Sequence, residues 1–199
     1  MAGSVPAELV ALAQRLADAA RPIANRYFRT ADAVDDKTDA SPVTIADREA
    51  ETAMRALLTE HVPQHGVFGE EHGAVRTDAE YVWVLDPIDG TKSFIAGMPV
   101  WGSLIGLLHK GCPAYGIMVQ PFTQERFTGD GRGALWRGPG CDHRMTERKL
   151  ATRRCERLAQ ATLMTTSPLL YEAAKLKGFL RIEARARLSR YGGDCYAFA

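Results

Sequence analysis

The stretch YVWVLDPIDGT, residues 81–91, constrains the fold of this chain more than any other segment. Its first five residues are mostly apolar and predict a buried strand. Asp86 and Asp89 follow on a turn that Pro87 stiffens and that Gly90 allows to bend sharply. The pattern predicts that both carboxylates emerge at one strand end, although an ordinary Asp-Pro surface turn would also fit the stretch taken alone.

Asp86 and Asp89 carry like charges, and like charges at short range raise a pKa or require a positive partner. A divalent metal ion is the simplest such partner. The nearby donors are oxygen atoms, with no His or Cys in the turn, and such donors suit Mg²⁺ better than Zn²⁺.

A second acidic element, VFGEE at residues 67–71, also runs from an apolar strand into paired carboxylates. In isolation, Glu70 and Glu71 fit a solvated loop. If the two strands lie side by side, however, their acids converge with other oxygen atoms into a set that could hold one or two Mg²⁺ ions. The expected donors are Glu70, Asp86, the Ile88 carbonyl, Asp89 and the Thr91 hydroxyl.

The composition is that of an ordinary globular chain of one or two domains, with 46% hydrophobic and 25% charged residues in 199. Lys and Arg total 25 against 24 Asp and Glu, so the charge does not favour nucleic acid or an anionic membrane as partner. The four cysteines form no CxxC pair, which suits free thiols in a reducing cytoplasm. The longest apolar stretch, residues 98–108, is too short to span a bilayer, and we expect a cytoplasmic protein.

Apolar spacing predicts two amphipathic helices, one from Pro6 through Ile23 and one from Thr44 to just before Pro63. Strands are expected at residues 101–109, 113–119, 126–128 and 134–137, which together favour an antiparallel sheet. Residues 141–157 are the most basic part of the chain. They are interpreted as a solvated surface or linker, with a phosphate or partner patch as the alternative.

GEE at residues 69–71 followed by DPIDGT at residues 86–91 resembles the inositol-monophosphatase-like family of Mg²⁺-dependent sugar and alcohol phosphatases. Lys37 and SPVTIAD at residues 41–47 resemble the upstream element of that family. The resemblance covers essentially the whole chain and implies an α+β fold of layered α-β-α-β-α sugar-phosphatase type. It places a large antiparallel sheet domain over residues 1–150 and the start of an incomplete second α/β domain over residues 151–199.

The resemblance also implies hydrolysis of a phosphate monoester, with Mg²⁺ held by Glu70, Asp86, Asp89 and the Ile88 carbonyl. The other implied roles are water activation by Asp47 and Thr91, a catalytic part for Glu70, phosphate contacts from Gly90 and Thr91, and a loop position near the metal for Lys37. From the residues alone, Asp47 could equally be a favourable helix-dipole charge, and Lys37 a solvated lysine.

DGTKSF with GMPVWG, and above all YGGDCYA at residues 191–197, is similar to the histidinol-phosphate phosphatase branch of the family. Asp194 is therefore expected to attract the cationic amine of histidinol phosphate, with a helix N-cap as the other explanation. The resemblance implies a role in histidine biosynthesis, a small phosphorylated substrate and a homodimer. A phosphatase for inositol phosphates or for another small polyol or nucleotide is the alternative substrate assignment.

The last ten residues, 190–199, predict a glycine-led helix that stops within about two turns. The resemblance implies a downstream aspartate as the last metal ligand, and the sequence has no residue in that place, so we expect a truncated chain. A catalytically incomplete relative that binds a metal or a partner is the alternative from a different functional class.

Overall fold

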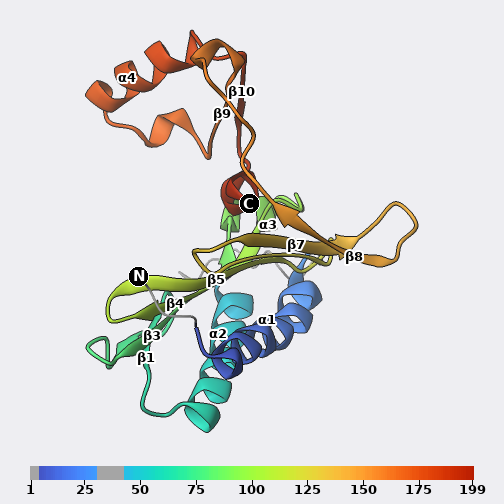
Figure 1. Cartoon of the computed structure of the whole chain (residues 1–199), viewed down its shortest axis with the longest axis vertical. Helices are drawn as coiled ribbons and strands as arrows, with labels where there is room; N and C mark the ends of the chain where they lie inside the picture. Colours follow the sequence, from blue (N-terminus) through green and yellow to red (C-terminus); the bar gives the residue numbers. More distant parts are fainter. Residues whose placement is uncertain (1–4, 31–42) are drawn as a thin grey trace.

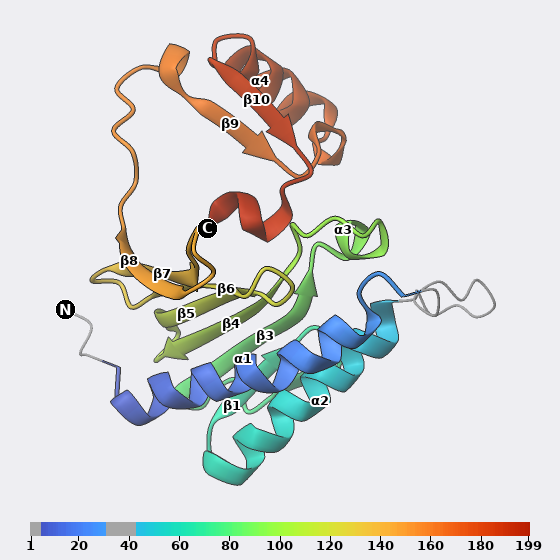
Figure 2. The ribbon, with the colours of Figure 1, turned by 90° about the vertical axis from the view of Figure 1, so that its right-hand side faces the viewer.

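The computed structural model describes residues 5–30 and 43–199. It begins with two helices, α1 (Ala7–Tyr27) and α2 (Val43–His61), where the apolar spacing predicts them. On α1 the buried residues recur every three or four positions, as in Leu9, Leu12 and Leu16. Both helices lie across the same face of a large sheet (Figure 2). No helix in the described part of the chain is long and apolar enough to cross a bilayer.

The large sheet has eight strands in the order β2-β1-β3-β4-β5-β6-β7-β8 (Figure 1). Their bounds are β1 (Gly66–Gly69), β2 (Gly73–Val75), β3 (Tyr81–Asp89), β4 (Gly102–His109), β5 (Cys112–Gln120), β6 (Glu125–Gly129), β7 (Ala134–Pro139) and β8 (Met145–Leu150). All neighbours are antiparallel except β1 and β3, which run parallel with Gly69 opposite Leu85. The expected mixed fold with a largely antiparallel sheet is confirmed, and its one parallel pair brings the two acid-bearing strand ends to the same edge.

Alternation along the central strands separates the two faces of the sheet. Residues such as Trp83, Leu85 and Ile105 are almost fully buried against α1 and α2 and form the main core. Asp86 points to the other face, where it pairs in register with Leu104, which in turn pairs with Met118. One face of the sheet therefore packs against the two helices, and Asp86 lies on the opposite face.

Residues 141–157, interpreted from the sequence as a solvated surface or linker, contain a regular strand in their middle part. Residues 145–150 form β8, which pairs antiparallel with β7 at the edge of the sheet. Nearly all its side chains are exposed, so no apolar alternation marks the strand in the sequence. Charged residues are typical of an edge strand, and Arg148 lies 4.4 Å over the Trp136 ring of β7.

The remainder of the chain forms a smaller unit beyond the large sheet (Figures 1 and 2). Its elements are the 3₁₀ turns η2 (Leu158–Gln160) and η3 (Pro168–Leu170), the parallel strands β9 (Thr162–Thr165) and β10 (Leu188–Tyr191), and helix α4 (Ala173–Glu183). The predicted glycine-led helix is the 3₁₀ helix η4 (Asp194–Phe198). It returns the chain to the large sheet, on the face opposite α1 and α2 (Figure 2). The boundary near residue 150 and the incompleteness of the second unit stay predictions.

Candidate active site

The parallel β1–β3 pair brings the predicted acids together at one sheet edge. The backbone N–H of Glu70, one residue past β1, donates to the Leu85 carbonyl at 3.2 Å. Asp86 and Asp89 lie at the end of β3. The register of the pairing between β3 and β4 shifts between these two residues. Pro87 has no N–H to donate there, and its carbonyl accepts from the Ser103 hydroxyl at 2.7 Å.

Asp86 lies where a negative charge is unfavourable. Its burial, followed by the charges of Glu70 and Asp89, raises the pKa of Asp86 to about 7, and the Ile88 backbone N–H opposes this shift. The Oδ1 atom of Asp86 is buried and has no hydrogen-bond partner among the described residues. A buried, unpartnered carboxylate oxygen beside two further acids is the arrangement that a hard cation would complete. The chemistry of these oxygen donors is therefore the kind that Mg²⁺ prefers.

Asp47 reaches the same edge from α2, just beyond the first turn of that helix. Burial, and then the charges of Glu71, Asp86 and Glu70, raises the pKa of Asp47 to about 8. Its side chain is 7% exposed. Helix α2 thus adds another carboxylate to the acid edge, which we define as Asp47, Glu70, Asp86 and Asp89.

Several expected contacts are absent from the described part of the chain. The Thr91 hydroxyl donates to the Ile88 carbonyl at 3.4 Å, and no hydrogen bond joins the Asp47 and Thr91 side chains. Nor do three acids, histidines or cysteines among the described residues converge closely enough to enclose a metal ion. Mutual repulsion of the carboxylates opposes such convergence unless a cation offsets it. Lys37 lies outside the described residues.

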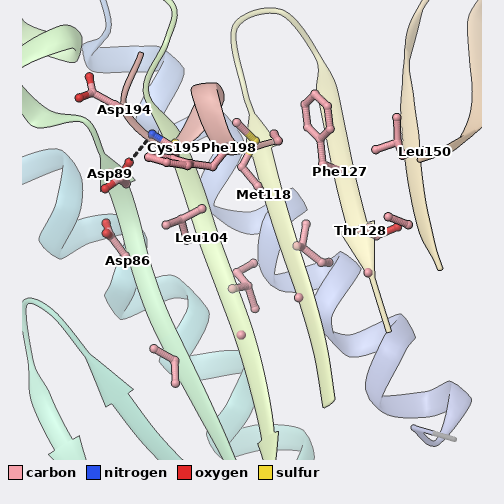
Figure 3. Close-up of a pocket in the computed structure, with 18 of the residues that line it drawn as sticks. Asp86, Asp89, Leu104, Met118, Phe127, Thr128, Leu150, Asp194, Cys195 and Phe198 are labelled. Carbon is pink, nitrogen blue, oxygen red and sulfur yellow. Dashed lines mark hydrogen bonds between the residues drawn. The ribbon is translucent and has the colours of Figure 1, made fainter. Parts of the chain in front are cut away.

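Helix η4 is attached by one hydrogen bond to Asp89 of the acid edge and by another to Ser93 of the helix that follows β3, residues 91–95. The Cys195 N–H donates to Asp89 Oδ2 at 2.9 Å (Figure 3), and the Ser93 hydroxyl donates to Asp194 Oδ2. Asp194 is buried at 8% exposure and has a φ of +41°. The N-cap of η4 is Gly193, without a side-chain cap, so Asp194 is not the N-cap. Its carboxylate is instead held beside the site.

Gly90 is required at the junction of β3 and helix α3 (Thr91–Ile95). It has a φ of +85°, in the left-handed region. A Cβ atom at this position would lie 3.0 Å from Asp194 Oδ2 and 3.1 Å from the Trp101 Cα. Gly90 therefore permits both the bend and the close approach of η4.

A cavity of about 780 Å³ opens on the face of the sheet away from α1 and α2. Asp86, Asp89 and Asp194 lie at one end of it, and the rest of the wall is mostly apolar, with Leu104 and Met118 among its residues (Figure 3). Two members of the acid edge, Asp86 and Asp89, thus border this cavity.

Sequence reasoning missed the part that Ser93 plays. Ser93 and Asp194 are separated by 101 positions, and no local pattern relates them. It also missed Glu51, which is fully buried on α2. The only signal for Glu51 was its spacing, four residues after Asp47 and four before Arg55, which places all three on one helix face.

The raised pKa values of Asp47 and Asp86 predict how stability depends on pH without added divalent cation. Between pH 5 and pH 8 the folded state retains protons on these carboxyls that the unfolded state has lost. The free energy of unfolding should therefore fall as the pH rises through this range. Urea denaturation in EDTA at pH 5, 6.5 and 8 measures this, with net stability rising toward pH 8 as the contradicting result.

Comparison with known proteins identifies the family of this chain. The family described as Inositol monophosphatase family matches residues 6–199. The Arabidopsis thaliana protein named "Bifunctional phosphatase IMPL2, chloroplastic" is 44% identical over 192 residues, which cover 95% of this chain and 53% of that protein. A Mycobacterium tuberculosis protein named "Histidinol-phosphatase" is 44% identical over 126 residues, 62% of this chain and 48% of that protein. The chain spans about half the length of these two relatives.

The fold is also that of solved structures. An inositol monophosphatase from Zymomonas mobilis matches with a TM-score of 0.83 and 42% identity, over 98% of this chain and 73% of that one. The sequence match, the shared fold and the acid edge at the β1–β3 strand ends lead to one conclusion. The chain belongs to the inositol monophosphatase family.

Proposed function

We propose that this protein hydrolyses small phosphate monoesters with Mg²⁺ and that its substrate is histidinol phosphate. The observation that carries the proposal is the acid edge, in which the buried Oδ1 of Asp86 has no hydrogen-bond partner within residues 5–30 and 43–199. Glu70, Asp86, Asp89 and the Ile88 carbonyl are the groups that would hold the metal. The relatives named as phosphatases support the reaction class.

Within this proposal the chain's own residues bind the phosphate and prepare the attacking water. When bound, Mg²⁺ would lower the pKa of water and offset the charge on the leaving oxygen. Asp47 would accept a proton from water as the carboxylate, a form that a bound cation would favour by lowering the raised pKa of this buried carboxyl. Thr91 would orient that water, and the backbone N–H groups of Gly90 and Thr91 would face the phosphate.

The substrate assignment depends on Asp194. Its carboxylate is buried, is held by Ser93 and lies at the acidic end of the cavity. A cationic amine on the substrate would gain a charge-assisted hydrogen bond there, whereas a neutral polyol would not. The relative named "Histidinol-phosphatase" supports this choice. The solved Zymomonas mobilis inositol monophosphatase favours the second candidate, an inositol phosphate.

Asp194→Asn tests the choice between these substrates. The change keeps the side-chain shape and removes the charge. We therefore expect kcat/KM for histidinol phosphate to fall at least about tenfold, which corresponds to the usual contribution of a hydrogen bond to a charged group. The value for myo-inositol 1-phosphate should change by less than about threefold. Phosphate release gives both values, and Asp78→Asn, at an exposed position, is the control. An equal loss for both substrates would contradict the amine contact.

A further inference from the structure

Glu51 of α2 is a fully buried carboxylate, at 0% exposure, that the proposed reaction does not use. Burying a charge is unfavourable unless hydrogen bonds and a counter-charge compensate for it. An apolar side chain would fill the same volume without that cost. The contacts of Glu51 should therefore indicate why a carboxylate lies there.

Those contacts all lead to the turn that follows Glu70. Glu51 accepts from the backbone N–H of Glu71 at 2.8 Å and from that of His72 at 3.2 Å. Arg55, one helical turn later, pairs with Glu51 at 2.6 Å and also donates to the Gly73 carbonyl. Two side chains of α2 thus hold the backbone of residues 71–73.

The fit between helix and turn is close at Gly69, the last residue of β1. A Cβ atom there would lie 1.9 Å from Glu51 Oε1. On one side of Glu70, Gly69 packs closely against Glu51. On the other side, the N–H of Glu71 donates to the Glu51 carboxylate. The N–H of Glu70 is bonded to β3 at Leu85. The backbone of Glu70 is fixed on both sides.

Helix α2 also carries Asp47, one turn before Glu51 and on the same face. The helix consequently sets two parts of the acid edge at once, by presenting Asp47 directly and by holding Glu70 through Glu51. The same rigid element determines how far Asp47 lies from Glu70 and Asp86.

We propose that Glu51, supported by Arg55, is a positioning residue that holds Glu70 in place for Mg²⁺ binding. The proposal rests on the proposed function for its metal. The hydrogen bonds that hold residues 71–73 can be measured separately, in protein without metal. Residues that orient metal ligands without touching the metal typically change metal affinity by about 10- to 100-fold when replaced.

Glu51→Gln is the direct test in the full chain. Gln keeps the shape, but its amide group places a donor against the donors of the turn and of Arg55. We expect the Mg²⁺ dissociation constant, measured by isothermal titration calorimetry, to rise at least about tenfold. In metal-free protein, the Glu71 and His72 amides should exchange hydrogen faster by a similar factor. Glu60→Gln on the same helix, with a side chain 70% exposed, should leave both quantities unchanged.

Arg55→Lys is the second variant, and it decides the question if Glu51→Gln does not fold. Lys keeps the charge but has no planar fork with which to bridge Glu51 and Gly73, so the Mg²⁺ dissociation constant should still rise, by roughly fivefold. If folded Glu51→Gln binds Mg²⁺ normally and its amides exchange at the normal rate, the proposed role of Glu51 is wrong. The same result in Arg55→Lys has that meaning when only Arg55→Lys folds. Failure of the wild-type protein to bind Mg²⁺ would instead contradict the proposed function.

Discussion

Asp86→Asn should abolish Mg²⁺-dependent phosphate release, with a loss of at least about 1,000-fold, equivalent to roughly 4 kcal/mol of transition-state stabilisation. Asn retains the size of Asp86 but removes the charge that a cation would bind. The same change should raise the free energy of unfolding of the metal-free protein at pH 8. The reason is that the charged form of Asp86, whose pKa burial raises to about 7, is unfavourable in the folded state.

If Asp86→Asn loses turnover but gains stability, Asp86 belongs to a metal site and not to a site that only supports the fold. Phosphate release gives the first quantity, and urea denaturation in EDTA gives the second. Asp130→Asn, in the exposed turn before β7, is the control for turnover. If Asp86→Asn kept its Mg²⁺-dependent turnover, the assignment of Asp86 as a metal ligand would be wrong. A loss of turnover through unfolding would indicate a structural role instead.

Gly90→Ala should destabilise the fold by about 2–5 kcal/mol, because two separate costs act at this position. The φ of +85° is strained for any residue with a side chain. The added methyl group would also press on Asp194 at 3.0 Å and on the Trp101 backbone at 3.1 Å. Urea denaturation measures the total cost.

Gly111→Ala is the matched control for Gly90→Ala. Gly111, in the β4–β5 turn, has a similar φ of +77°, but none of the residues that the structure describes lies within 4 Å of an added Cβ. It should cost only about 1 kcal/mol, so that the difference between the two variants reports the contact with η4 and Trp101. Equal costs for the two glycines would contradict the close packing of η4 against the β3–α3 junction.

The acids at the two strand ends, Glu70, Asp86 and Asp89, could be predicted from the sequence because their signals are local, whereas Asp47 was indicated only by the family resemblance. An apolar strand, a Pro-stiffened turn and a glycine follow one another within residues 81–91, and residues 67–71 repeat the pattern of strand and acids. Placing the two strand ends together needed only that the strands be neighbours, which the parallel β1–β3 pair provides. The helices were equally predictable, since their apolar residues follow the helical period.

The elements that sequence reasoning missed depend on contacts between distant residues or on exposed strands. Ser93 contacts Asp194 across 101 positions, and Glu51 contacts the turn about 20 positions later. Neither pairing leaves a periodic signal. Strand β8 buries almost none of its side chains, so its sequence looks like a solvated linker although its backbone completes the sheet. Hydrogen bonding of an exposed edge strand is a tertiary property that hydrophobic patterning does not record.

Phosphate release from histidinol phosphate and from myo-inositol 1-phosphate, each measured with and without Mg²⁺, decides whether this protein is a Mg²⁺-dependent phosphatase. It compares this 199-residue chain with a longer form that continues into the corresponding segment of a relative. We expect Mg²⁺-dependent release, faster for histidinol phosphate, in at least the longer form, and its loss on Asp86→Asn. No release from either substrate by either form would contradict the proposed function and favour a non-catalytic, metal- or partner-binding protein.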